Sequence, residues 1–524
     1  MSLEAYLRNL HASPRESGSS GWQVDWEDAP FKYKLYRGLP AVPLCAEVPL
    51  ALAGRSAPAS PDLTSVGHML WYMYGLTQLS QVCVPGSMNP GLNSMHLHRR
   101  FVPSGGGLYP NELYVYLKID GAPDGVYHYD AAHHRLLLLR RGNFDPYMER
   151  ALGNRCKMRS CFAAIFISTV FWKNYYKYNQ LAYRLQGLDT GALIGQTLEV
   201  ADRFGFACGL YYQFLDRAVH RLLGVAGEEE SVYAIIPLST EPADGWFLDG
   251  GRAESDVRAA ELDRELDPIR PVVLERSRNK KPYPMLVRMN EASMLERSGV
   301  FRQVAPEPQA DSALRAVYLP RTGVLVGDLA DKCRRRQSPE AGFVMSRPPG
   351  ARVGGMLQEA ADRRFRSDLD AAPGVPASRV QLYGCFTHVE GVPDGAYRYD
   401  PDVHALRRLN PGDHRADLQR GMYLDNVNLF QVPICLHVAG PQHFYKAELG
   451  YRGYRIQQME AGLLVQRLLL AASSLGMGGR PLLGFDSATC DALYRFAPQG
   501  ETCLIQLPVG SYRPSARLEG GLRT

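Results

Sequence analysis

Residues 124–130 read Asp-Gly-Val-Tyr-His-Tyr-Asp, and residues 394–400 read Asp-Gly-Ala-Tyr-Arg-Tyr-Asp. The two copies lie 270 residues apart, and other matches continue at almost the same offset. The pair Tyr-Arg at 183–184 recurs at 454–455, an offset of 271. Because both the order and the spacing of the matches persist, we interpret the chain as a tandem duplication.

Both copies predict the same succession of elements. A helix is expected at 63–76 before the first repeat, and each copy then alternates strands with one long central helix that stops at a glycine. This pattern predicts an α+β fold, with a sheet covered by helices. The predicted strands are 113–119, 161–169 and 231–238 in the first copy and 380–388, 433–438 and 502–509 in the second, and the central helices are 189–205 and 460–476.

The repeat also predicts the domain boundaries. We expect an N-terminal extension (1–50), a first domain (51–240), a linker (241–300), a second domain (301–515) and a short tail (516–524). The linker is rich in charge and proline, with one short helix expected at 261–265. The extension lacks sustained periodicity but carries several aromatic residues, and these predict that it packs over the body of the protein. They are Trp22, Trp26, Phe31, Tyr33 and Tyr36.

Composition excludes several functional classes. Of the 524 residues, 45% are hydrophobic and 22% charged, as in ordinary globular proteins, and no apolar run approaches the roughly 20 residues of a membrane helix. A net charge of +5 is too mild to predict nucleic-acid binding. The start of the chain shows no secretory signal, so a cytoplasmic location is the expectation. The ten cysteines are scattered singly, and no metal-ligand pattern is present.

A glycine-rich stretch precedes the first repeat. Residues 101–114 read Phe-Val-Pro-Ser-Gly-Gly-Gly-Leu-Tyr-Pro-Asn-Glu-Leu-Tyr, so Pro103 and Pro110 bracket Ser104 and three glycines. Glycines allow peptide N–H groups to approach an anion or a flat ring closely, and Ser104 adds a hydroxyl. A flexible surface turn is the alternative interpretation. The basic run 334–336 leaves a similar choice between a solvated cluster and an anion site.

The glycine stretch, the first repeat and the later Lys177-Tyr178 and Tyr183-Arg184 pairs together resemble the SagB-type azoline dehydrogenases of the nitroreductase superfamily. The resemblance covers both halves of the chain. It implies FMN as cofactor and a flavin bound at the interface of two nitroreductase-like units. The duplication would then form a pseudo-dimer within one chain, either as a monomer or in a higher homo-oligomer.

The resemblance also implies which residues hold the flavin. The Pro-Ser loop is present only in the first half, because residues 352–357, the expected counterpart, lack it. The second half carries the basic run and a Gly-Met-Gly-Gly-Arg stretch, whose arginines suit phosphate oxygens. We therefore expect one composite site per chain and a degenerate opposite interface. The expected flavin-binding residues are Pro103, Ser104, Gly105, Gly106, Arg334, Arg335, Arg336, Ser338, Gly476, Gly478 and Arg480.

Lys177 and Tyr178 match an important Lys-Tyr pair of the dehydrogenases, and the second half has no such pair. We expect Tyr178 to take the ring proton, provided that the adjacent Lys177 lowers its pKa. The alternative is a structural role among the many aromatic residues of this segment. Arg184 and Arg455 are expected to pair with carboxylates of their own halves, Asp189 and Glu460 respectively.

These observations predict an FMN-dependent dehydrogenase that oxidises thiazoline or oxazoline rings in a ribosomally made peptide and returns electrons to oxygen. The expected partners are the azoline-containing peptide and the cyclodehydratase proteins of the same pathway. Two alternatives remain open at this point. One is a reductase that uses NAD(P)H, or an oxidase for nonribosomal peptides, and the other is a scaffold without catalytic activity that recruits the peptide.

Overall fold

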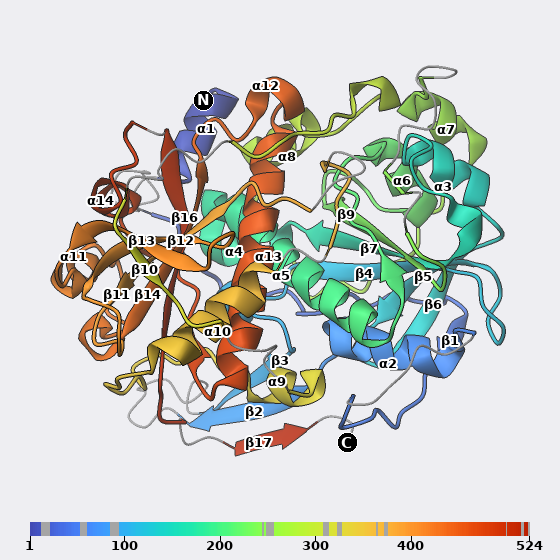
Figure 1. Cartoon of the computed structure of the whole chain (residues 1–524). Coiled ribbons are helices and arrows are strands. Elements are labelled where there is room, and N and C mark those ends of the chain that lie inside the picture. Colours follow the sequence, from blue (N-terminus) through green and yellow to red (C-terminus); the bar gives the residue numbers. More distant parts are fainter. Residues whose placement is uncertain are drawn as a thin grey trace.

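The computed structural model describes residues 1–11, 21–52, 60–83, 94–243, 246–247, 256–307, 314–321, 327–362, 365–370, 376–498, 500–514 and 518–521. Two antiparallel sheets lie on opposite sides of a central pair of long helices (Figure 1). Within the described residues, no helix is both long enough and apolar enough to cross a membrane.

The first domain contains a seven-stranded sheet in the order β1-β6-β5-β4-β7-β9-β8. The first repeat forms β5, which pairs with β4 and β6 near the middle of the sheet. The strands are β1 (Ala41–Pro43), β4 (Asn111–Leu117), β5 (Gly125–Asp130), β6 (Arg135–Arg141), β7 (Cys161–Val170), β8 (Ala207–Cys208) and β9 (Glu230–Ser239). The helices are α2 (Leu63–Tyr74), α3 (Asp145–Ala151), α4 (Trp172–Tyr178), α5 (Ala182–Arg203) and α6 (Asp216–Leu223).

The second domain repeats this topology strand for strand, in the order β10-β13-β12-β11-β14-β16-β15. The tandem duplication and the α+β class predicted from the repeat are therefore confirmed. The strands are β10 (Ala316–Tyr318), β11 (Gln381–Phe386), β12 (Gly395–Asp400), β13 (Ala405–Pro411), β14 (Ile434–Pro441), β15 (Gly478–Gly479) and β16 (Glu501–Gly510). The helices are α9 (Leu329–Arg335), α10 (Gly350–Ala361), α11 (Arg415–Arg420), α12 (Lys446–Leu449), α13 (Arg452–Ser474) and α14 (Ser487–Leu493).

The predicted helix boundaries are close to the observed ones. The two central helices begin earlier than expected, and each ends before a glycine in the left-handed region, Gly205 (φ 77°) and Gly476 (φ 67°). The alignment of residues 352–357 with the glycine loop was wrong, because this segment lies inside α10. Register along β4 and β11 places the true counterpart about 269 residues after the loop, where residues 371–375 are outside the described part of the chain.

The two domains are joined where α5 crosses α13. A Cβ added to Gly191 would stand 2.7 Å from the carbonyl carbon of Met459, and one added to Gly462 would stand 2.9 Å from that of Leu188. The two contacts are copies of each other, because both pairs are offset by 271 residues. The helix backbones therefore touch along a pseudo-twofold axis, and only glycine permits this approach.

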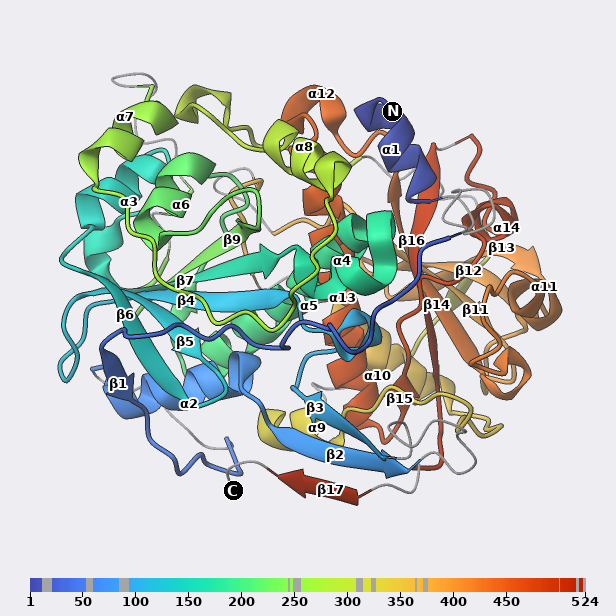
Figure 2. The ribbon, with the colours of Figure 1, turned by 180° about the vertical axis from the view of Figure 1, so that it is seen from behind.

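Extension, linker and tail all pack on this body. The N-terminal extension, dark blue in Figure 2, runs from α1 (Leu3–Asn9) across the domain interface to β1. Tyr36 forms a β-bridge with Val273 of the linker, which also contains α7 (Ala259–Glu265), at the predicted short helix, and α8 (Pro284–Ala292). The tail returns to the first domain, where β17 (Leu518–Gly521) extends a small sheet of β2 (Gln78–Cys83) and β3 (Ser94–Arg99).

Replacing Gly191 with Ala tests the helix crossing. The new methyl group would overlap the backbone of α13, so we expect a loss of about 1–3 kcal/mol or more and a clearly lower Tm in a thermal unfolding experiment. Gly520→Ala is the matched control, because a Cβ there meets no atom within 4 Å. Equal Tm values for the two variants would contradict the close approach of the helices.

Candidate active site

The glycine-rich loop is a tight turn between β3 and β4. Gly106 and Gly107 both have a φ of +64°, in the left-handed region that favours glycine. Ser104 holds the turn closed, because its Oγ accepts a hydrogen bond from the Tyr109 amide at 2.8 Å and its carbonyl accepts one from the Gly107 amide at 2.9 Å. The loop is therefore an ordered turn rather than an open surface segment.

Lys177 and Tyr178, at the end of α4, lie directly against this loop. A Cβ added to Gly106 would stand 2.5 Å from Tyr178 Oη and 2.9 Å from Lys177 Nζ. The polar ends of both side chains thus reach the backbone of the loop at a position where only glycine leaves room. The structure brings together two motifs that are more than 70 residues apart in the sequence.

The loop and the Lys-Tyr pair line a cavity of about 1760 Å³ between the two domains. Its walls come from three parts of the chain. The first domain contributes Pro103 to Gly107, Lys177, Tyr178, Leu185 and Asp189. The second domain contributes Arg336, Ser338, Arg480 and the segment 481–486, and the N-terminal extension contributes Leu10, His11 and Lys32. A pocket of this size exceeds the usual range for small-molecule sites.

One end of the cavity is strongly cationic. Arg336 is buried at 4% exposure, and burial, followed by the neighbouring Arg99 guanidinium, lowers its pKa to about 10. Its Nε donates to Phe101 O at 2.8 Å and its Nη1 to Ser338 Oγ at 3.2 Å. Arg480 donates to the carbonyl of the same Ser338, and its Nε is buried without a partner among the described residues. Guanidinium groups gathered in this way suit the oxygens of a phosphate.

Four of the expected flavin-binding residues lie away from this cavity. Arg334 donates to the carbonyl of Leu50, and Arg335 pairs with Asp331 on the exposed face of α9. Gly476 ends α13, and Gly478 packs against Pro339. The remaining expected residues, Pro103 to Gly106, Arg336, Ser338 and Arg480, all line it. Sequence alone did not separate Arg336 from its two neighbours, because the separation depends on where α9 ends.

The protonation of the Lys-Tyr pair differs from the sequence expectation. Burial raises the pKa of Tyr178 to about 12, and the nearby Asp189 carboxylate acts in the same direction. Burial lowers the pKa of Lys177. The expectation that Lys177 lowers the pKa of Tyr178 is therefore wrong, because desolvation of the phenol outweighs the adjacent cation.

Asp189 is a site residue that sequence reasoning did not identify. It lies on α5 at 8% exposure and lines the cavity. Ser104 Oγ donates to its Oδ2 at 2.5 Å, and the Gly105 amide donates to its Oδ1 at 3.0 Å. Asp189 thus tethers the glycine loop to the central helix. Its carboxylate is the first acidic group after Lys177 in the sequence, which is a weak signal without the fold.

Arg184 and Arg455 do not pair with carboxylates of their own halves as expected. Arg184 donates to the Leu504 carbonyl of β16, at 2.5 Å, and to Leu10 O at 3.0 Å. Arg455 lies 4.4 Å from the centroid of the Tyr233 ring on β9. Each arginine therefore crosses the pseudo-twofold axis into the other domain, where it helps to join the two units.

The position related to this cavity by the pseudo-twofold axis is almost filled. The cavity there measures about 130 Å³ and is bordered by Glu460, the counterpart of Asp189. Arg379 occupies the space in front of it, pairing with Glu460 at 3.1 Å and Asp370 at 2.9 Å. A volume of this size is well below that of ordinary ligand pockets. The two interfaces of the pseudo-dimer are therefore unequal.

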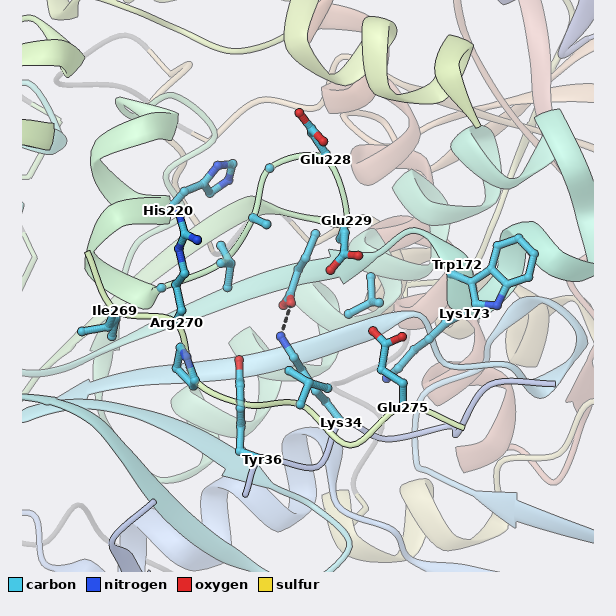
Figure 3. Close-up of a pocket in the computed structure, with 18 of the residues that line it drawn as sticks. Lys34, Tyr36, Trp172, Lys173, His220, Glu228, Glu229, Ile269, Arg270 and Glu275 are labelled. Atoms are coloured by element: carbon cyan, nitrogen blue, oxygen red, sulfur yellow. Dashed lines mark hydrogen bonds and ion pairs between the residues drawn. The ribbon is translucent and has the colours of Figure 1, made fainter. Parts of the chain in front are cut away.

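Another cavity, of about 1030 Å³, lies on the first domain beside the linker (Figure 3). At its base Lys34 Nζ donates to Glu230 Oε2 at 2.5 Å, and Tyr36, His220, Arg270 and Glu275 are among its lining residues. None of the site residues expected from the sequence lines it. Charges of both signs are interleaved on its walls, so it offers no single ligand chemistry.

The fold and this interdomain cavity define a two-domain α+β oxidoreductase type, and the comparisons agree. The nitroreductase family model matches residues 77–238 and 377–511, which together make up more than half of the chain. The chain belongs to the nitroreductase family.

Individual relatives are more distant. A nitroreductase-type protein of Methanocaldococcus jannaschii is 29% identical over 117 residues, which cover 22% of this chain and only 57% of that protein. A crystal structure of a nitroreductase-type protein from Anabaena variabilis covers 98% of this chain and 99% of its own, with 21% identity and a TM-score of 0.73, a likeness of fold. The Escherichia coli microcin synthetase McbBCD complex with truncated pro-MccB17 bound matches 39% of this chain and 69% of its own, with 19% identity and a TM-score of 0.27.

Asp189→Asn tests the buried carboxylate. Burial raises the pKa of Asp189 from 3.8 to about 7, so the folded state holds this proton more tightly than the unfolded state does. Ionisation therefore destabilises the fold as the pH rises from about 4 to 7, by up to roughly 4 kcal/mol. Asn cannot ionise, so we expect the Tm of the variant, relative to the wild type, to rise between pH 5 and pH 8. A constant difference would show that Asp189 is already ionised at pH 5.

Proposed function

We propose that this protein is an FMN-dependent dehydrogenase that oxidises thiazoline or oxazoline rings to thiazoles or oxazoles in a modified peptide. The observation that carries the proposal is the convergence of Lys177 and Tyr178 on the backbone of the glycine loop, inside a cavity with a cationic end. The resemblance of these same motifs to the SagB-type dehydrogenases supports the substrate class.

The residues present suit a flavin mononucleotide. The buried Arg336, with Arg99 beside it, and the unpartnered Nε of Arg480 would hold the phosphate. The loop of Pro103 to Gly106 would bring its amide groups close to the ring system, since Gly106 has no side chain to keep them apart. When bound, the flavin would supply a two-electron acceptor for the hydride that leaves the azoline.

Lys177 is the better candidate for the base that removes the ring proton. Its pKa is lowered by burial, so more of the amine is neutral at physiological pH than for an exposed lysine. Tyr178 keeps its proton up to about pH 12 and can donate a hydrogen bond that orients the substrate. The structure thus supports exchanging the two roles that the sequence suggested.

The cavity has more volume than a flavin alone needs, which leaves space beside the loop for a substrate segment. We propose a peptide that carries the azoline as the substrate, and the cyclodehydratase that makes the azoline as a partner. An NAD(P)H-using reductase, an oxidase for nonribosomal peptides and a recruiting scaffold are the outcomes that the experiments below separate from this proposal.

Arg336→Ala tests the phosphate end. Loss of a buried guanidinium with its charge-assisted hydrogen bonds should weaken FMN binding by about 10- to 100-fold. Absorbance of the purified protein near about 450 nm, followed by FMN titration, measures this. Arg335→Ala is the matched control, because Arg335 is exposed on the same run and pairs only with Asp331. Equal occupancy in both variants would place the phosphate elsewhere.

Lys177→Arg and Tyr178→Phe test the assigned roles. Arginine keeps the positive charge but does not give up its proton, so kcat should fall by about 100- to 10,000-fold with FMN still bound. Tyr178→Phe should cause a smaller loss and raise KM. The wild-type rate should increase with pH through the lowered pKa of Lys177, and Lys177→Arg should abolish that rise. A variant that retains the full rate would exclude Lys177 as the base.

The reaction itself is tested by incubating an azoline-containing peptide with the protein in air, without NAD(P)H, and measuring the peptide mass. Oxidation of one ring removes two hydrogen atoms. Turnover that requires NAD(P)H would instead favour the reductase. A protein that binds the peptide but takes up no flavin would favour the scaffold.

A further inference from the structure

The N-terminal extension reaches the active cavity at two places. Leu10 and His11, just after α1, line it, and so does Lys32 further along the extension. Arg184 of α5 donates to Leu10 O, and His11 Nε2 lies 3.0 Å from Tyr454 Oη of α13. The extension is therefore fastened to both central helices at the wall of the cavity. It lies outside the two segments that match the nitroreductase family model.

The extension also packs on α4, the helix that presents Lys177 and Tyr178. Trp22 Nε1 donates to the Tyr176 carbonyl at 3.0 Å, and its ring meets Tyr175 edge-on. Trp26 meets the Tyr176 ring at 90°, with centroids 6.1 Å apart, and remains 58% exposed. Tryptophan is rarely this exposed without a reason in function or binding.

The contact that Trp26 makes with Lys177 supplies such a reason. Lys177 Nζ lies 5.3 Å from the centroid of the Trp26 ring and 5.0 Å from that of Tyr178. In the described part of the chain, this amine has neither an ion pair nor a hydrogen-bond acceptor. Two aromatic rings and the loop at Gly106 therefore determine its position. Lys32, also from the extension, is the cation that faces it across the cavity wall.

We propose that the N-terminal extension is a working part of the active site, in which Trp26 acts as a positioning residue for Lys177. The indole face attracts the ammonium form and keeps the amine beside the glycine loop. Without the ring, the flexible lysine side chain would sample orientations away from the substrate. This inference rests on the proposed role of Lys177, and its first test needs no turnover.

The first test measures how the acetylation rate of Lys177 depends on pH, by peptide mass spectrometry of the FMN-loaded protein. We expect Trp26→Leu to move the midpoint to lower pH, because the ammonium loses the π face. Trp26→Phe, which keeps a ring, should restore most of the wild-type midpoint. Trp22→Phe is the control, since Trp22 packs on the same helix through Tyr175 and Tyr176. An unchanged midpoint in Trp26→Leu, or a shift to higher pH, would overturn the proposal.

The second test compares kcat and FMN occupancy in the same variants. We expect kcat to fall roughly tenfold or more in Trp26→Leu, with the acid limb of the pH profile moved as in the acetylation experiment and FMN occupancy unchanged. Full activity in Trp26→Leu would contradict a positioning role. If the wild type oxidises no azoline but the acetylation midpoint still shifts, the proposed function fails while the contact between Trp26 and Lys177 stands.

Discussion

The structure depends on the backbone contact between α5 and α13. Gly191 and Gly462 allow the two longest helices to cross with carbonyl groups where side chains would otherwise stand. Both sheets pack against these helices, so this crossing sets the distance between the domains and the width of the cavity between them. Tyr183 and Tyr454 stack on the same axis, with centroids 6.1 Å apart, and extend the contact. A side chain at either glycine would force the two halves of the site apart.

Joining the two units in one chain permits the two interfaces to differ. Each central helix carries a carboxylate at the same position, Asp189 or Glu460, and a buried carboxylate needs hydrogen-bond donors or a cation. Ser104 and the Gly105 amide satisfy Asp189 and leave the cavity open. Arg379 satisfies Glu460 and fills the equivalent space. The linker strengthens the difference, since Trp246 and Phe247 cover Gly209, the counterpart of Arg480.

Much of the candidate site could be read from local sequence. The glycine loop was recognisable because bends without side chains have a distinct composition, and the Lys-Tyr pair because one half has it and the other lacks it. The pKa values of that pair could not be read in this way. Burial acts on Tyr178 from all sides, whereas sequence shows only its neighbour Lys177. Asp189 was missed for the same reason, because its partners Ser104 and Gly105 are more than 80 residues away.

The sequence by itself determined the duplication, the order of the elements and the asymmetry of the loop. These follow from repeats and periodicities, which reflect local backbone preferences. Only the tertiary structure decided that Arg336 rather than Arg334 or Arg335 faces the cavity, that Arg184 and Arg455 cross to the opposite domain, and that Trp26 lies against Lys177. These outcomes depend on how helices end and cross, and on which side chains are excluded from water. Such properties arise from packing between distant segments and leave no periodic trace in the chain.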